Sequence, residues 1–182
     1  MKARILLCAI LVLVISACKP DRNKLIETIN QEQADLLMTD ITADDEKAQN
    51  LVKHFIEFVD AFPKDSLAPQ YLMHAAEFSS QMGNTDEAIE YLDRIISDYE
   101  NYEDIALCYF LKGHFYDIDE RYDDAILAYN TYLNLFPDHY LAESTRKMLP
   151  YVGMPSEELL ELVQEQANAN EMNNKTTEKT SK

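Results

Sequence analysis

The sequence predicts an all-α fold, and three observations lead to that prediction. Apolar residues recur at the helical period of 3.6 residues through most of the chain, and no segment of length alternates as a strand does. Only 3 Gly and 6 Pro are available for turns among 182 residues, too few for a many-stranded barrel or sandwich. A helix-pair pattern also repeats at a spacing of 37 residues, which is typical of an α-solenoid of antiparallel helix pairs.

The first 17 residues have the features of a signal peptide. Lys2 and Arg4 precede an apolar run from Ile5 to Ile15, which is shorter than the roughly 20 residues that span a bilayer. Small residues then precede Cys18, and this junction resembles the lipobox of bacterial lipoproteins. The resemblance implies a lipoprotein signal peptide over 1–17 and acylation of Cys18, by palmitate among other chains, as a stable membrane anchor. The alternative that stays open is an ordinary secretory peptide with Cys18 near its cleavage site.

The residue after the cysteine and the net charge bear on location and partners. Lys19 follows Cys18, which by resemblance to the enterobacterial sorting rule implies a lipid-anchored protein of the outer membrane; we expect it to face the periplasm. The formal net charge is −17, and loss of the signal leaves 33 acidic against 14 basic residues. Phosphates repel such a chain, so we expect no nucleic-acid partner and no membrane contact other than the lipid.

After the signal, segment 18–43 is expected to be a lipidated tether with a helix from Asp21 to Leu37, which either packs on the array or stands off from it. Segment 44–152 is expected to be the repeat array, because Asp86-Glu87-Ala88-Ile89 recurs 37 residues later as Asp123-Asp124-Ala125-Ile126 and Phe62-Pro63 recurs 74 residues later. The helices expected in the array cover 51–62, 68–82, 85–98, 104–119, 122–136 and, as a C-terminal cap, 138–149. A short helix over 153–163 and a disordered, polar tail over 164–182 follow.

Small residues in the array have a spacing that resembles a known family. Gly113, Ala125 and Pro137 follow one another at intervals of twelve, and Ala76 and Ala88 match the first two of these one period earlier. This pattern resembles tetratricopeptide repeats. With the lipobox, the chain resembles the tetratricopeptide lipoproteins of Bacteroidota-type bacteria, and its repeat unit is similar to those of the Tol–Pal coordinator and the β-barrel assembly lipoprotein. The resemblance implies a tetratricopeptide-like α-solenoid with a flanking N-terminal helix and a C-terminal cap.

The small residues also have a structural role that can be predicted. Gly113 is expected to let two helices approach closely, so a bulky replacement is expected to force them apart. Gly83 lies in a corner between helices, and substitution there is expected to cost less unless its backbone is left-handed. Cys108 stands alone among apolar neighbours and is expected to be a buried, inert side chain.

The family resemblance also implies a partner-binding groove on one face of the first helices. Counted from Ala76 and Gly113, the contact positions are Gln70, Met73, Glu77, Ser80, Gln81, Leu107, Phe110, His114, Asp117 and Ile118. This set mixes apolar and acidic residues and contains no Lys or Arg. We therefore expect an envelope protein or peptide partner with basic and apolar residues, whose on-rate falls as salt rises. The alternative is that the N-terminal helix occupies the groove.

Residue types that carry catalysis or bind metals do not have the spacing that such sites require. The four histidines show neither HxxxH nor HExxH spacing, and the acidic run from Asp117 to Asp124 lacks the glycine and the closing glutamate of a calcium loop. We expect no catalytic residue, metal or cofactor, and a non-catalytic scaffold as the function. The alternative from another class is a glycan-handling accessory or hydrolase that uses acidic groove residues.

Overall fold

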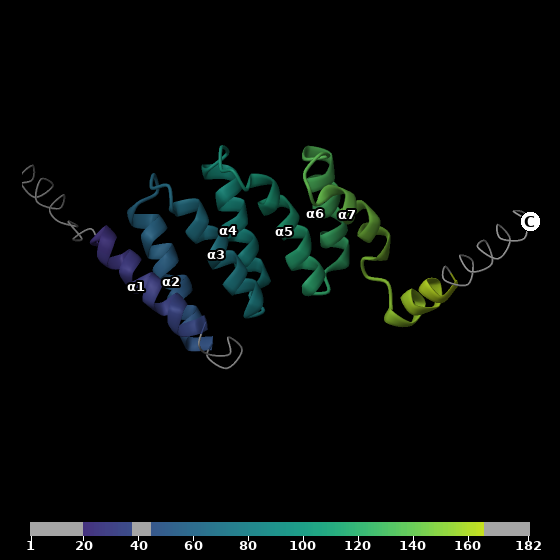
Figure 1. Ribbon diagram of the computed structural model, residues 1–182, viewed down its shortest axis with the longest axis horizontal. Coiled ribbons are helices and arrows are strands. Elements are labelled where there is room, and N and C mark those ends of the chain that lie inside the picture. The colour runs from purple at the N-terminus through teal and green to yellow at the C-terminus, as the bar shows by residue number, and fades with distance from the viewer. Residues whose placement is uncertain (1–19, 38–44, 166–182) are drawn as a thin grey trace, which may run out of the picture. The chain divides into compact units, whose positions relative to one another are not determined.

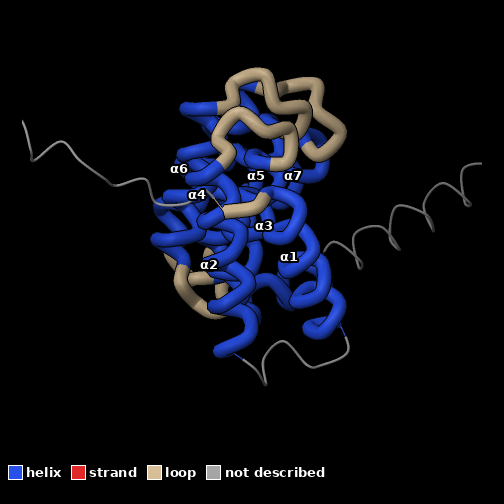
Figure 2. The backbone as a smooth tube through the Cα atoms, turned by 90° about the vertical axis from the view of Figure 1, so that its left-hand side faces the viewer, coloured by secondary structure: helices blue, strands red, loops and turns tan. Residues whose placement is uncertain are grey.

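The computed structural model describes residues 20–37 and 45–165, and every regular element within them is a helix (Figures 1 and 2). The helices are α1 (Arg22–Leu37), α2 (Asp45–Ala61), α3 (Ala68–Gln81), α4 (Thr85–Asp98), α5 (Ile105–Ile118), α6 (Tyr122–Leu135), α7 (Ala142–Met148) and the 3-10 helix η2 (Leu149–Tyr151). Residues 156–165 form a further helix. The prediction of an all-α fold is confirmed. The chain divides into two compact units, 1–82 with α1 to α3 and 83–182 with α4 to α7.

In the first unit, α2 packs against both α1 and α3. Its fully buried side chains Leu51, Phe55, Phe58 and Val59 have the spacing of a single helical stripe. The rings of Phe55 and Phe58 both contact that of Tyr71 on α3, with centroids 5.3 and 4.8 Å apart. The buried residues of α1 are Leu25, Ile29 and Leu36. The first unit is therefore held together by an aromatic and aliphatic core around α2.

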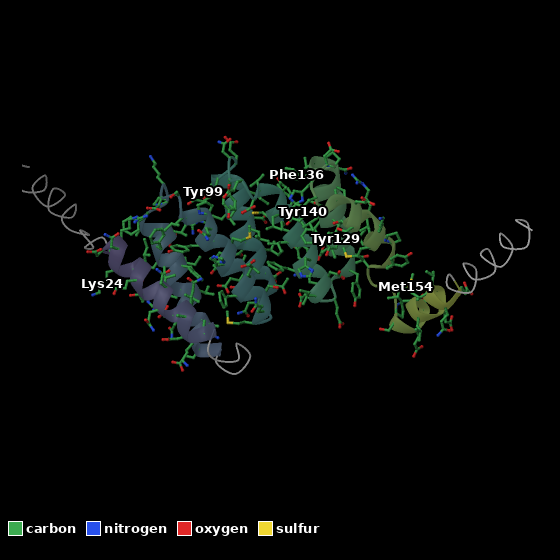
Figure 3. All side chains as sticks on the ribbon, viewed as in Figure 1. Lys24, Tyr99, Tyr129, Phe136, Tyr140 and Met154 are labelled. Atoms are coloured by element: carbon green, nitrogen blue, oxygen red, sulfur yellow. The ribbon has the colours of Figure 1, made fainter. Side chains whose placement is uncertain are left out.

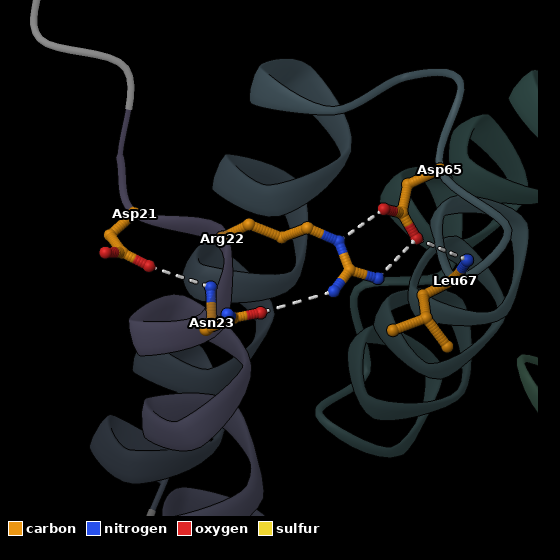
Figure 4. Close-up of polar contacts among 5 residues, drawn as sticks. All are labelled: Asp21, Arg22, Asn23, Asp65 and Leu67. Carbon is orange, nitrogen blue, oxygen red and sulfur yellow. Dashed lines mark hydrogen bonds and ion pairs between the residues drawn. The ribbon is translucent and has the colours of Figure 1, made fainter.

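Polar contacts fix the N-terminal end of α1 (Figure 4). The carboxylate of Asp21 accepts a hydrogen bond of 2.9 Å from the backbone N–H of Asn23, which caps the helix. Arg22 reaches the corner between α2 and α3, where its Nε and Nη2 donate to the two oxygens of Asp65 at 2.6 and 3.1 Å. The Leu67 backbone N–H donates to the same carboxylate at 3.0 Å. The hydrogen bond from Arg22 lowers the pKa of Asp65.

Helix α1 does not stand apart from the other helices of the first unit. It packs along α2, and Glu32 on α1 lies 2.7 Å from Nδ1 of His54 on α2. Helix α1 thus supplies the first helix of a pair with α2. The sequence pattern did not predict this pairing, because α1 has no glycine or alanine at the repeat spacing that marks the later pairs.

In the second unit, α5 packs against both α4 and α6. The buried side chains of these three helices include Ile89, Leu92, Ile95, Cys108, Phe115, Tyr129 and Tyr132. The expectation for Cys108 is confirmed: its side chain is fully buried, and burial raises the pKa of its thiol to about 12. A thiol with that pKa is protonated near neutral pH and is a poor nucleophile.

The corners after α3 and α5 both contain a residue with left-handed backbone. Gly83 has φ +78°, which is left-handed, and substitution at this position is therefore expected to be costly. Glu120, 37 residues later, has φ +58°, although it carries a side chain. The Arg121 N–H bonds to the carbonyl of Tyr116 at 2.9 Å and the Glu120 N–H to that of Asp117 at 3.1 Å, the pattern of a Schellman cap.

Several helix boundaries differ from the predicted ones. Helix α2 begins at Asp45, six residues before the predicted start at 51. The cap predicted over 138–149 begins only at Ala142, because a turn follows Pro137 in which the His139 N–H bonds to the Phe136 carbonyl. It ends as α7 at Met148 and continues as η2. The cap is therefore shorter than predicted.

The C-terminal helix lies at 156–165 and not at 153–163, because Gly153 has φ +76° and Pro155 precedes the first turn. Residues 164 and 165, predicted to belong to the disordered tail, end this helix. The predicted signal peptide, Cys18, residues 38–43 of the predicted tether and the predicted tail from 166 onward lie outside the described residues. No helix among the described residues is both long and apolar enough to cross a bilayer.

Candidate functional site

Helix α5 presents all five of its predicted groove residues to solvent. His114 and Ile118 are exposed, and Leu107, Phe110 and Asp117 are half-buried. The Phe110 ring stacks on that of His114, with centroids 6.1 Å apart. Spaced three or four residues apart, these side chains form one continuous face of the helix. The second unit therefore contains an accessible surface at the predicted positions.

Helix α3 presents only part of its predicted set. Gln70 and Gln81 are exposed and Glu77 is half-buried, but Met73 and Ser80 are buried. A partner therefore cannot reach Met73 or Ser80 without a rearrangement of the structure. The predicted residues on α3 and those on α5 belong to different units. The packing around each helix therefore sets their accessibility separately.

The face of α5 is supported from beneath by two tyrosines of α6. The rings of Tyr129 and Tyr132 both lie 5.7 Å from that of Phe110 and are fully buried. Tyr129 is labelled in Figure 3. A Cβ atom placed on Gly113 would lie 2.5 Å from Cδ1 of Tyr129, closer than carbon atoms approach in proteins. Gly113 therefore allows Tyr129 to lie directly against the backbone of α5, as the small-residue pattern predicts.

The hydroxyl of Tyr129 is buried without a hydrogen-bond partner among the described residues. Burial and, secondarily, the carboxylate of Asp117 raise its pKa above the ordinary value. Tyr132 differs, because its hydroxyl shares a hydrogen bond of 2.6 Å with Nδ1 of His139. An unsatisfied buried hydroxyl next to predicted groove residues is a weak point in an otherwise close-packed pair.

The predicted groove set contains acidic residues but no Lys or Arg. Oε2 of Glu77 lies 3.2 Å from Nδ1 of His74 on the same helix, within hydrogen-bond distance. The cations of the second unit are engaged elsewhere, since Arg121 bonds to Asp86 and Asp124. The predicted surface is therefore acidic and apolar.

Within the described part of the chain, no three His, Cys, Asp or Glu side chains come together as a metal site would require. Cys108 is sealed in the core with its thiol protonated, so it does not offer a nucleophile at neutral pH. Among the described residues, the accessible face of α5 offers surface for recognition.

One feature of the surface was missed by sequence reasoning, although the sequence holds a signal for it. Leu127 and Leu135 on α6 are 68% and 54% exposed. One period of 37 residues earlier, the matching positions are Glu90 and Asp98. Aligning the two repeats would have shown that apolar residues replace charged ones on one outer stripe of α6.

Short helices that pack against their neighbours within each unit, with a glycine at a point of close approach, are typical of an α-helical repeat protein. Two segments match the family model of the tetratricopeptide repeat, residues 70–102 and residues 106–139. The first match runs from α3 through α4 and the second covers α5 and α6. The chain thus contains tetratricopeptide repeats, which supports the resemblance drawn from its small residues. Repeats of this kind indicate a scaffold for protein–protein interaction.

Neither the curated proteins nor the solved structures show a significant match to the chain.

Proposed function

We propose that this protein is a non-catalytic tetratricopeptide scaffold that binds a protein or peptide partner of the cell envelope. In this proposal it is anchored through lipid on Cys18 in the outer membrane and faces the periplasm. The partner segment carries basic and apolar residues. The two repeat matches support the class of protein, and the signal-like N-terminus supports the location.

The face of α5 is the observation that carries the proposal. Leu107, Phe110, His114, Asp117 and Ile118 are all accessible on one helix face. Apolar side chains that are accessible and rigidly supported are the usual anchors of protein interfaces. Phe110 fits this description, because Tyr129 and Tyr132 hold its ring from below.

Charge gives the proposal its partner chemistry. Asp117 on α5 and Glu77 on α3 are the acidic members of the set, and the set has no cation of its own. A basic segment would gain from these carboxylates and from the net charge of −17, which steers cations toward the chain. Glu77 and Asp117 are thus proposed binding residues, together with Gln70 and Gln81.

Capture in living cells tests the scaffold. A photoreactive residue at position 114 on α5 is expected to crosslink a partner that the same residue at position 160 does not. Asp117→Lys and Glu77→Lys are expected to weaken binding of that partner by about tenfold and to flatten its salt dependence. Asp119→Lys makes the same charge change at an exposed site two residues away and serves as the control. Equal affinities for the three variants would exclude this face.

Fractionation tests the anchor separately. Cys18→Ser is expected to give a folded protein that leaves the membrane fraction, because the described helices offer no membrane span. A variant that stays with the membrane after a salt wash would contradict lipid anchoring through Cys18 and leave the scaffold role untouched.

The non-catalytic part of the proposal has its own assay. Purified full-length protein is incubated with cell-envelope glycans and the released reducing sugar is measured. No release above the level of a heat-denatured sample is expected. Release that Glu77→Gln or Asp117→Asn abolishes would favour the hydrolase alternative instead.

A further inference from the structure

The pair of α5 and α6 has a second accessible surface besides the predicted groove. A hollow of about 210 Å³ has Tyr109, Lys112 and Tyr116 of α5 as its floor. At about 100° per residue, these three positions lie roughly 160° around α5 from the mean direction of its groove residues. The wall on α6 is formed by Asp124, Leu127, Ala128 and Thr131. The hollow therefore belongs to the opposite side of the helix.

One exposed apolar side chain lines this hollow, and a second lies further along the same helix. Leu127 lines it and is 68% exposed, and Leu135, two turns further along α6, is 54% exposed. The first repeat has Glu90 and Asp98 at these positions. The second repeat thus has exposed leucines at two positions where the first repeat has charged residues. The repeat architecture does not require apolar side chains there. Of the two leucines, only Leu127 lines the hollow, where it is joined by the rings of Tyr109 and Tyr116. A hollow with apolar and aromatic lining and a few polar groups is typical of a binding site.

The rim of the hollow carries a surplus of negative charge. Lys112 Nζ lies 2.5 Å from Asp93, and Arg121 bonds to Asp86 at 2.6 Å and Asp124 at 3.0 Å. Three carboxylates thus share two cations. Arg121 also lies 4.6 Å above the ring of Tyr116, which brings its acidic partners to one end of the hollow. The carboxylates of Asp86 and Asp93 are 86% and 53% exposed, so they remain accessible to a further cation.

The same charge disfavours the C-terminal helix 156–165 and a second copy of the chain as occupants. The C-terminal helix 156–165 has exposed leucines but carries four glutamates and no Lys or Arg. A second copy of the chain would bring another net charge of −17 to the contact. Like charges across an interface are repulsive, so the rim selects a basic occupant.

We propose that this hollow binds a partner peptide that combines an apolar anchor with a basic residue. A leucine or phenylalanine side chain enters between Tyr109 and Leu127. A neighbouring Lys or Arg of the peptide then lies opposite Asp93 or Asp124 at the rim. The surface is distinct from the predicted groove, and a partner bound here leaves Phe110 and Ile118 free.

The experiment uses the isotope-labelled full-length chain and a short synthetic peptide of Lys, Leu and Phe that carries a spin label. We expect broadening of the amide signals of Tyr109, Leu127 and Thr131. A twin peptide with Glu in place of Lys is expected not to bind, and added salt is expected to weaken the binding of the basic peptide. Broadening confined to Phe110, His114 and Ile118, or equal binding of the acidic twin, would overturn the proposal.

Variants separate this surface from the predicted groove. Leu127→Arg is expected to lower the affinity for the basic peptide by about tenfold or more, which is the usual loss when an interface anchor is removed. Leu160→Arg, at a leucine that is 58% exposed on helix 156–165, is the matched control and is expected to bind as the original does.

If Ile118→Arg abolishes binding and Leu127→Arg does not, the peptide uses the groove and this proposal fails while the proposed function stands. If Leu127→Arg alone abolishes it, the groove residues are not needed for this peptide. Thermal melting of each variant shows whether it folds. If Leu127→Arg does not fold, the map of spin-label broadening on the unmodified chain decides between the two surfaces.

Discussion

The two tetratricopeptide repeats have helices of the same length but bury different residues at matching positions. Helices α3, α4, α5 and α6 all have 14 residues. The second helix of the first repeat buries Leu92 and Ile95, and the matching positions of the second repeat bury Tyr129 and Tyr132. The small position on the first helix changes in the opposite sense. It is Ala76 in the first repeat and Gly113 in the second.

The comparison teaches that the repeat spacing and the core packing are set by different features of the sequence. The spacing places corners and small residues, and so it fixes helix length. The sizes of the side chains at matched positions then have to suit each other, because protein interiors are close-packed. A larger ring in the second repeat is accommodated by the loss of one methyl group opposite it.

The largest expected effect comes from breaking this fit at Gly113. Gly113→Leu is expected to lower the free energy of unfolding by about 1–3 kcal/mol or more, because even a Cβ would lie 2.5 Å from Tyr129. Chemical denaturation of the full-length chain measures the loss. Thr131→Leu on the surface of α6 is the control, and an equal loss in both variants would contradict the close approach.

The same fit can be tested by restoring it. In a chain that carries Tyr129→Leu, the change Gly113→Ala is expected to cost less than it does in the original chain. Residues in direct contact give non-additive changes of this kind. Strictly additive effects would show that the two positions do not interact.

The next effect, about 1–2 kcal/mol, is expected at the left-handed corners. Gly83→Ala is expected to destabilise the protein, because φ at this position is +78° although no atom would clash with the new Cβ. At the matching position, Glu120→Gly is expected to stabilise it, because a residue with a side chain holds φ +58° there. The two substitutions have opposite expected signs, and denaturation midpoints that move in the same direction would refute the explanation.

A smaller contrast, about 0.5–1.5 kcal/mol, separates the two buried tyrosines of α6. Tyr132→Phe removes the hydrogen bond to His139 and is expected to destabilise the protein by that amount. Tyr129→Phe removes a hydroxyl without a partner and is expected to be neutral or stabilising. Each variant is the control for the other, since both rings are fully buried. A large loss for Tyr129→Phe would indicate that a water molecule satisfies its hydroxyl.

The smallest effect concerns the corners that follow Phe62-Pro63 and Phe136-Pro137. At matching positions these corners have Asp65, bound by Arg22, and His139. The pKa of Asp65 is lowered from its ordinary value of 3.8, so the carboxylate stabilises the folded state above that pH. The contribution is lost as the pH falls through the lowered pKa. The stability difference between the original chain and Asp65→Asn is therefore expected to be constant near neutral pH and to shrink below about pH 4. Exposed Asp138→Asn is the control, and a difference that does not change with pH would exclude the ion pair as its source.

Much of the fold could be predicted from the sequence, because the repeat leaves a periodic trace. The interval between Ala76 and Gly113 located two repeats, and the acidic first turns located the starts of α4 and α6. Helix α4 has the predicted bounds, 85–98. The pairing of α1 with α2 could not be predicted, since it involves side chains such as Glu32 and His54 that meet across 22 residues of sequence and leave no periodic trace.

Less of the candidate site could be predicted. The periodicity identified which positions share a helix face, and on α5 all five are accessible. It could not show that Met73 and Ser80 on α3 are buried, because burial depends on what packs over a helix. The hollow at Leu127 was missed for the same reason, since it arises where side chains of two helices leave space between them.

The fit between Gly113 and Tyr129 also constrains the order in which such a repeat can change during evolution. A chain with alanine at the small position that acquires the tyrosine first would pass through an overpacked and poorly folded intermediate. A chain that acquires the glycine first loses only about 1 kcal/mol of helix stability, and the void it leaves can then accept the ring. Purifying selection against unfolded proteins would thus favour the glycine as the earlier substitution. Once the tyrosine is in place, reversion of the glycine is blocked, so this pair of changes acts as a one-way step in the history of the repeat.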